Sequence, residues 1–276
     1  MISILILTLN EEQNLPACLE AVKWSDDILV VDSFSSDRTV EIAKVAGARV
    51  LQRPFDDFAR QRNFGLIEGG LKHDWVLHLD ADEIVSCDLR AEALTATRTT
   101  DKDAFRVASQ MMFQGRWLKH AGLYPSYQVR LGRRDKLSFT QVGHGQREML
   151  PPDRVGTLRA PLVHYSFAKG LHDWVEKHNR YSTAEATHFL ARSPGAPIDW
   201  TGLLRGDPTR RQRALKDIAG RLPCRPFLRF LYMFVVRAGI LDGMAGFHYC
   251  RLLTIYEYLT MLKMRELERR RQGLPI

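Results

Sequence analysis

The sequence has few of the features that mark several common protein classes. Its 276 residues include only four cysteines, and none of them has the short paired spacing of a zinc site or a disulfide framework. Such sparse use of cysteine indicates a reducing compartment. No apolar run reaches the roughly 18 uninterrupted residues of a membrane span. Met1 leads directly into an apolar run, so we expect no signal peptide before the fold.

Three nucleotide-binding fingerprints are also missing. No Gly-x-Gly-x-x-Gly follows the first apolar run, which argues against a dinucleotide dehydrogenase or a typical methyltransferase. No Gly-x-x-x-x-Gly-Lys-[Ser/Thr] occurs, which argues against a P-loop NTPase. The glycine-rich start of a sugar nucleotidyltransferase is absent as well, and the chain has no internal repeat.

The first hundred residues instead alternate between apolar strand-like runs and helical patterns. The predicted strands cover residues 2–8, 28–32, 48–51 and 75–79, and predicted helices between them include 39–46 and 57–67. Near-continuous apolar strands separated by helices predict a parallel sheet that is covered on both faces. The predicted fold class is therefore α/β, with a doubly wound, mostly parallel sheet.

Acidic residues follow the ends of these strands. Asp80, Asp82 and Glu83 lie within four residues of one another, and carboxylates so close together repel each other. A divalent cation such as Mg²⁺ or Mn²⁺ would relieve the repulsion, although capping of the next helix is an alternative. Glu11 and Asp32 also follow strands, so we expect all of them at one edge of the sheet, where α/β proteins bind ligands.

Four blocks in this region resemble the ordered motifs of family 2 glycosyltransferases. The blocks are Leu7–Glu12, Val30–Thr39, Gln61–Gly65 and Leu79–Glu83. Enzymes of that family have the GT-A fold, use nucleotide-diphosphate sugars and invert the anomeric centre. Looser matches at 124–131, 164–166 and 179–182 resemble a bacterial subgroup that includes lipopolysaccharide-core β-glycosyltransferases.

This resemblance implies a donor site at the first two blocks. Glu11 and Asp32 would contact the ribose and the base of the nucleotide, most often uridine, and Thr8 would bind the donor with them. Carboxylates suit this role because they accept hydrogen bonds strongly from hydroxyl and N–H groups. For Asp32 the alternative is a turn residue at the end of a strand.

The resemblance also implies roles in the third and fourth blocks. Arg62 would lie near the nucleotide or its diphosphate, where a guanidinium can pair with phosphate oxygens; a solvated helix residue is the alternative. Asp80 would touch the ribose or the metal, and Asp82 would be the main metal ligand. A metal held there would stabilise the charge of the departing nucleoside diphosphate.

Two residues are candidates for the catalytic base. The resemblance implies a carboxylate directly after a histidine, but the chain has Gly145 at that place, after His144. Either Glu148 or His144 would then act as the base, unless the two sequences are in a different register. Glu148 as a solvated loop charge and His144 as a loop hydrogen bonder are the alternatives. His164 is a candidate ligand or acceptor contact, but we expect a satisfied core histidine.

The charge of the chain is unevenly distributed. The formal net charge is +8, but residues 1–100 hold 10 basic and 17 acidic residues, so the remainder is strongly basic. We divide the chain into a GT-A domain at 1–192, with halves at 1–100 and 101–192, and a basic helical appendage at 198–276. The proline- and glycine-containing stretch 193–197 is the expected break between them.

The appendage contains an aromatic, apolar stretch at 226–241 that Arg229 and Arg237 interrupt. This composition predicts a helix in the lipid headgroup layer, with its arginines drawn to lipid phosphates. A helix at about 249–271 would follow. A helical hairpin packed on the main domain, or a dimer contact, is the alternative. Nucleic acid is an unsuitable partner because no nucleic-acid-binding motif occurs and the N-terminal half is acidic.

Together these features predict a metal-dependent, inverting glycosyltransferase. It would move a hexose from a nucleotide sugar, most often a UDP-sugar, to a lipopolysaccharide core or another cell-envelope glycan or glycolipid. Its expected location is the cytoplasm, peripheral on the inner face of the cell membrane. A catalytically silent sugar-nucleotide-binding or scaffold protein is the alternative, and Gly145 keeps it open.

Overall fold

The structure, a computed structural model, describes residues 1–142, 145–191, 200–201 and 224–276. The chain divides into two compact units, 1–174 and 175–276. The predicted break at 193–197 lies outside the described residues.

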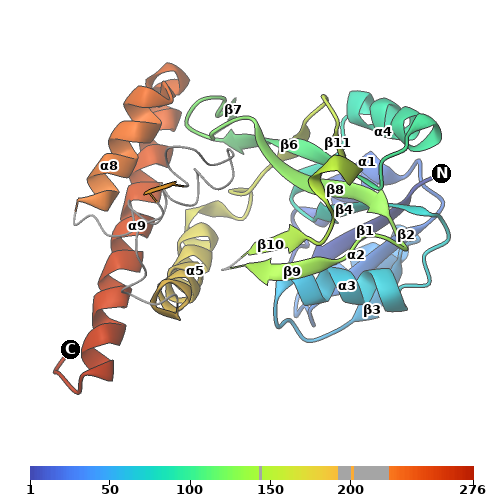
Figure 1. Cartoon of the computed structure of the whole chain (residues 1–276). Coiled ribbons are helices and arrows are strands. Elements are labelled where there is room, and N and C mark those ends of the chain that lie inside the picture. Colours follow the sequence, from blue (N-terminus) through green and yellow to red (C-terminus); the bar gives the residue numbers. More distant parts are fainter. Residues whose placement is uncertain (143–144, 192–199, 202–223) are drawn as a thin grey trace. The chain divides into compact units, whose positions relative to one another are not determined.

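The first unit contains a ten-stranded sheet in the order β3-β2-β1-β4-β8-β6-β12-β5, with β11 and β7 paired to β6 (Figure 1). Its strands are β1 (Ser3–Thr8), β2 (Ile28–Asp32), β3 (Arg49–Gln52), β4 (Trp75–Asp80), β5 (Glu83–Ile84), β6 (Ala104–Phe113), β7 (Arg116–Trp117), β8 (Ser126–Arg133), β11 (Val155–Thr157) and β12 (Leu162–His164). β1 to β4 are parallel, and β8 runs antiparallel to both of its neighbours. The predicted mostly parallel α/β sheet is confirmed, and β8 adds a reversal that the sequence did not reveal.

The remaining elements of this unit are four helices, a 3₁₀ turn and a small hairpin. They are α1 (Leu15–Val22), α2 (Thr39–Val45), α3 (Phe58–Glu68), α4 (Cys87–Thr99), the turn Pro152–Arg154, and the antiparallel strands β9 (Phe139–Val142) and β10 (Gly145–Glu148). Two helices begin at side-chain caps: Asp57 accepts from Arg60 N at 2.7 Å, and Ser86 accepts from Leu89 N at 3.1 Å.

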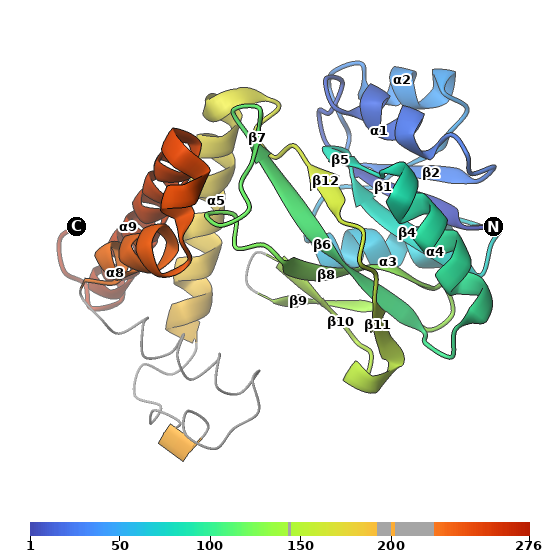
Figure 2. The same cartoon turned by 90° about the horizontal axis from the view of Figure 1, so that it is seen from above.

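Helices cover both faces of the sheet. The apolar side chains of α1, α2 and α4 pack with one set of strand residues, and those of α3 pack with the alternate set. Figure 1 shows α4 and α3 on opposite sides of the sheet, and Figure 2 shows α1 beside α2. At Gly65 a Cβ atom would lie 2.6 Å from Leu5 Cδ1, so glycine permits the close approach of α3 to β1.

The second unit is helical and contains most of α5 (Gly170–Ala191), which begins at the end of the first unit. Its other elements are α8 (Arg225–Leu231), a π-helical turn (Tyr232–Val236), a 3₁₀ turn (Gly239–Asp242) and α9 (Gly243–Arg271). Lys263 on α9 donates to Ser182 Oγ at 2.9 Å and to Asn179 Oδ1 at 2.7 Å. Two residues of the 179–182 motif therefore fasten α5 to α9, and the predicted helical appendage is confirmed.

No single described helix has both the length and the apolar composition of a membrane span. The arms 225–236 and 239–271 meet these criteria only when taken together, and they are bent by 73°.

Candidate active site

The predicted convergence of strand ends is present in the structure. In the register of the sheet, Thr8 lies opposite Asp32 on β2, and Leu7 lies opposite Asp80 on β4. Thr8 Oγ1 donates to Asp32 Oδ1 at 2.9 Å. The carboxyl ends of β1, β2 and β4 therefore bring Thr8, Asp32 and Asp80 to one edge.

Asp32 is fully buried and organises the turn after β2. Its carboxylate accepts from Ser35 N at 2.9 Å and from Gln52 Nε2 at 3.1 Å, in addition to Thr8 Oγ1. Asp32 therefore acts as a turn residue at the end of a strand, which was the alternative to nucleotide binding. It lies at the edge where the nucleotide was predicted to bind.

Glu11 lies in the loop that follows β1 and is joined to a distant part of the chain. Its backbone N–H donates to Thr39 Oγ1 at 2.7 Å, and its carboxylate accepts from Asn14 Nδ2 at 2.7 Å. Lys169, 158 residues away, donates from Nζ to Glu11 Oε1 at 2.8 Å and to Asn10 O at 3.0 Å. This lysine places a positive charge at the predicted donor site, and the sequence analysis missed it.

Two buried arginines hold Asp80. Arg62 Nη2 donates to Asp80 Oδ1 at 2.6 Å, and Arg130 Nη2 donates to Asp80 Oδ2 at 2.9 Å. Arg62 is only 2% exposed, so the alternative of a solvated helix residue is wrong. Its guanidinium binds a protein carboxylate, and both oxygens of Asp80 are occupied by arginine.

Glu83 completes this buried cluster. Its carboxylate accepts from Asp80 N at 2.9 Å and from Arg130 Nη2. Burial and the neighbouring Asp80 raise the pKa of Glu83 to about 7, against the pull of Arg130. Burial opposes the charge of Asp80 too, but Arg130 and Arg62 hold the pKa of Asp80 well below its usual range. Asp80 therefore stays ionised.

Asp82 pairs with His164, at the end of β12. His164 Nε2 lies 3.3 Å from Asp82 Oδ2, and Nδ1 lies 3.3 Å from Ser109 Oγ. Tyr165 N donates to Asp82 O at 2.8 Å. Burial opposes the charge of the ring, but Asp82 raises the pKa of His164 to about 9. Both ring nitrogens thus have partners, as expected of a satisfied histidine, and one of these partners is the predicted metal ligand.

The donors at this edge fit partial coordination of a divalent cation. Asp82 oxygen and His164 nitrogen are both ligand types that Mn²⁺ accepts, and they already lie within contact of each other. Asp80 is a poorer ligand than predicted because arginines occupy both of its oxygens. The described residues contain no group of three or more acidic, histidine or cysteine side chains suited to a metal. A cation held by Asp82 and His164 would therefore keep positions open for other oxygen ligands, as Mg²⁺ commonly does with phosphates.

The chain is similar to known glycosyltransferases. The family model for Glycosyl transferase family 2 matches residues 3–146, just over half of the chain. The chain belongs to glycosyl transferase family 2. An uncharacterised glycosyltransferase of Rickettsia typhi is 26% identical over 278 residues, which cover 96% of this chain and 87% of that protein.

Two further similarities are more partial. The lipopolysaccharide core biosynthesis glycosyltransferase LpsC of Rhizobium meliloti is 27% identical over 191 residues, which cover 67% of this chain and 70% of LpsC. This match confirms the resemblance to the lipopolysaccharide-core subgroup. The crystal structure of glucosyl-3-phosphoglycerate synthase from Mycobacterium tuberculosis aligns with a TM-score of 0.48 and 19% identity, over 70% of this chain and 79% of that one, too distantly to bear on substrates.

Glu148, one of the two predicted bases of this family 2 glycosyltransferase, lies in the β9–β10 hairpin. Glu148 ends β10 opposite Phe139, and Asn63 of α3 fastens Phe139 with two hydrogen bonds of 2.9 Å. His144 lies outside the described residues. Among those that are described, no hydrogen bond or ion pair joins Glu148 to the carboxylates of Asp80 and Asp82, so its catalytic role stays a prediction.

Arg130 is the residue of this glycosyltransferase that sequence reasoning should have found. It belongs to the quoted 124–131 motif, yet it was used there only as a mark of resemblance. The side chain is 6% exposed and bridges Asp80 and Glu83. An arginine inside an apolar strand sequence such as Val129–Leu131 is a usable signal, because a buried guanidinium requires a buried counter-charge.

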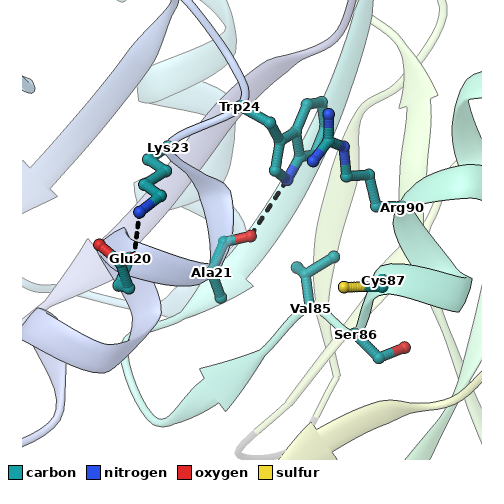
Figure 3. Close-up of a pocket in the computed structure, with 8 residues that line it drawn as sticks. All are labelled: Glu20, Ala21, Lys23, Trp24, Val85, Ser86, Cys87 and Arg90. Atoms are coloured by element: carbon teal, nitrogen blue, oxygen red, sulfur yellow. Dashed lines mark hydrogen bonds and ion pairs between the residues drawn. The ribbon is translucent and has the colours of Figure 1, made fainter.

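A separate pocket lies between α1 and α4 of the glycosyltransferase. It measures about 530 Å³ and is lined by Glu20, Ala21, Lys23, Trp24, Val85, Ser86, Cys87 and Arg90. The Arg90 guanidinium lies 5.3 Å from the centre of the Trp24 ring, and Trp24 Nε1 donates to Ala21 O at 3.1 Å (Figure 3). None of these residues is a predicted site residue, so the pocket is distinct from the acidic edge.

Proposed function

We propose that this enzyme transfers a hexose from a UDP-sugar to a lipopolysaccharide core, or to another cell-envelope glycan or glycolipid, with inversion of the anomeric centre. The observation that carries this proposal is the meeting of Asp82 with His164 beside the arginine-held Asp80, at the edge that also carries Thr8 and Asp32. The match to LpsC supports the class of acceptor.

The nucleotide would bind across the ends of β1 and β2. Glu11 and Asp32 carry acceptors for ribose hydroxyls and base N–H groups, and Thr8 holds Asp32 in place. Arg62 and Arg130 act as positioning residues, because each binds Asp80 from a buried position. The ammonium group of Lys169, already at Glu11, is suited to meet the diphosphate.

Asp82 and His164 would hold a divalent cation, Mg²⁺ or Mn²⁺. When bound, such a cation acts as a Lewis acid toward phosphate oxygens and stabilises negative charge. His164 must be neutral to serve as a ligand, so it gives up the proton that Asp82 favours. Ser109 Oγ, 3.3 Å from Nδ1, can orient the ring by a hydrogen bond at the other nitrogen.

The transfer itself is a single displacement. The acceptor oxygen forms a bond to the anomeric carbon as the bond from that carbon to the β-phosphate oxygen breaks, and the departing UDP takes the electron pair. A base removes the proton of the acceptor hydroxyl. Glu148 and His144 are our candidates for this base.

The charge of the chain also supports a location at the inner face of the cell membrane, in the cytoplasm. The residues after 100 are strongly basic, and basic surfaces are attracted to anionic lipids. An acceptor anchored in the membrane would be presented at that surface.

Release of UDP from UDP-sugars in the presence of Mn²⁺ tests this proposal. Asp82→Ala should lower the rate at least about a hundredfold, because a metal contributes several kcal/mol of charge stabilisation. His164→Ala should raise the Mn²⁺ concentration needed for half-maximal rate. Asp101→Ala is the matched control, since that carboxylate is 78% exposed and should not affect the rate.

Two outcomes would contradict the proposal. Full activity of Asp82→Ala would remove the acidic edge from the mechanism. A protein that binds UDP-sugars without turnover, across a broad panel of acceptors, would instead favour a catalytically silent sugar-nucleotide-binding or scaffold protein.

A further inference from the structure

The chain bends sharply between α8 and α9. The π-helical turn ends at Val236, Ala238 takes a left-handed conformation (φ 58°), and Gly243 has φ 65° where α9 begins. The two arms, 225–236 and 239–271, are bent by 73° at this break. α8 packs beside α9 (Figure 2), so the bend forms the end of a helical hairpin.

The side chains at this bend are apolar and exposed. We define the apolar tip as the exposed side chains of Tyr232, Val235, Val236, Ile240, Leu241 and Met244. Val236 is 72% exposed and Leu241 is 67% exposed. Single exposed apolar residues are common on soluble proteins, but a contiguous group marks an interaction surface.

The interior of the same hairpin contains a buried ionic cluster beside apolar residues such as Met233 and Cys250. Glu257 on α9 is 3% exposed and pairs with Arg225 Nη2 at 2.7 Å and with Arg229. The expectation that Arg229 turns to lipid phosphates is therefore wrong, because its guanidinium binds Glu257. Glu257 thus holds Arg225 and Arg229 inside the hairpin, while the apolar tip lies at its surface.

Aromatic contacts between the two arms give the hairpin a defined shape. The Phe230 and Phe234 rings stack with centroids 5.2 Å apart, and Phe247 of α9 meets Phe234 edge-on at 5.7 Å. These contacts join the two arms directly. The tip residues are thus displayed on an ordered support and are not a loosely packed core.

The charge near the apolar tip distinguishes a lipid surface from a second copy of the chain as its partner. Of the four arginines between Cys224 and Glu257, Arg225 and Arg229 pair with Glu257, which leaves Arg237 and Arg251 against one other acidic residue, Asp242, which is only 6% exposed. Two copies meeting through this surface would bring like charges together. Anionic lipid instead offers hydrocarbon to the apolar side chains and phosphate to Arg237 and Arg251.

We propose that the apolar tip inserts into the boundary between headgroups and acyl chains of an anionic lipid bilayer. Val236 and Leu241 enter the apolar layer, and Arg237 lies between them in sequence at headgroup level. This membrane surface belongs to the second unit and does not depend on the donor site. It therefore holds whether or not the proposed sugar transfer is correct.

Flotation of the full-length protein with vesicles tests the insertion. The wild type should float with phosphatidylcholine–phosphatidylglycerol vesicles and bind less to phosphatidylcholine alone. Val236→Asp/Leu241→Asp should lower the partition coefficient at least about tenfold, because each substitution removes the burial of an apolar side chain. Val45→Asp/Ile67→Asp, at sites 84% and 76% exposed, is the matched control and should float like the wild type.

Further measurements distinguish lost insertion from misfolding, inactivation and dimerisation. The far-ultraviolet circular dichroism and unfolding midpoint of the tip variant should match the wild type, since both substitutions are at exposed positions. Release of UDP to water or a soluble acceptor should also be unchanged, so loss of flotation is distinct from failure of the enzyme proposal. Equal flotation of the two double variants would overturn the inference. So would a wild-type dimer that ignores vesicles and dissociates in the tip variant.

Discussion

Replacing Arg130 with methionine tests whether buried cations hold the acidic edge together. Arg130 Nη2 lies 2.9 Å from Asp80 Oδ2 and also donates to Glu83, whose side chain is 1% exposed. Methionine keeps part of the apolar volume but leaves Glu83 buried without its counter-charge. Loss of one partner from a buried ion pair costs about 3–5 kcal/mol, so the free energy of unfolding should fall by about that amount.

A second substitution shows whether the loss arises from the uncompensated carboxylate. Glu83→Gln keeps an oxygen that can accept from Asp80 N but removes the negative charge. The double variant Arg130→Met/Glu83→Gln should therefore regain about 1–3 kcal/mol relative to Arg130→Met. Arg38→Met is the matched control, because Arg38 and its partner Glu41 are both exposed, and its unfolding midpoint should not change.

The loss in Arg130→Met should also depend on pH. Burial already raises the pKa of Glu83 from 4.5 to about 7, and removal of Arg130 would raise it further. Between the unfolded and folded pKa values the native state binds more protons, so stability falls as pH rises. The deficit should therefore be larger at pH 8 than at pH 5.5.

Urea unfolding followed by tryptophan fluorescence measures these differences, with UDP release as a parallel readout. Activity should fall with stability because Arg130 positions Asp80. The reasoning is refuted if Arg130→Met costs less than about 1 kcal/mol at pH 8, or if adding Glu83→Gln restores none of the loss.

Two other substitutions test the surroundings of the site. Lys169→Met should weaken UDP binding about tenfold and leave uridine binding unchanged, because only UDP offers phosphate to the ammonium group; calorimetry showing equal losses for both ligands would limit Lys169 to holding Glu11. His78→Leu should leave stability unchanged or raise it by about 1 kcal/mol, because both ring nitrogens are buried and, within the described residues, lack hydrogen-bond partners. Urea unfolding that shows a loss above about 2 kcal/mol would contradict this.

The sheet and its acidic edge could be predicted because their signals are local. The apolar runs before Thr8, Asp32 and Asp80 predict buried parallel strands, and parallel strands bring their carboxyl ends to one edge. The cap of α3 was readable for the same reason, since Asp57 precedes the helix that it caps. The antiparallel β8 was missed because the direction of a strand is not encoded in its own periodicity.

The partners of the carboxylates could not be predicted from local patterns. Arg130 is 50 residues from Asp80, and Lys169 is 158 residues from Glu11. His164 follows an apolar run, which made a core histidine the reasonable expectation until β12 placed it beside Asp82. The helical appendage is a further example of a partner that is distant in sequence. Nothing near Arg229 indicates that Glu257, 28 residues later, is its partner.

The charge balance of the site gives an independent reason to expect a cation with the donor. Glu11 is paired with Lys169, Asp82 with His164, and the pair Asp80 and Glu83 with Arg62 and Arg130. These four carboxylates thus already have basic partners, whereas neutral groups hold Asp32. A diphosphate entering this site would add negative charge that these pairs do not offset, and desolvated charge of one sign is costly. Either Lys169 would leave Glu11 for the phosphates, or Asp82 and a neutral His164 would hold a divalent cation. If Lys169 moves, the freed oxygen of Glu11 can turn to the ribose, which would couple recognition of the nucleoside to neutralisation of its diphosphate.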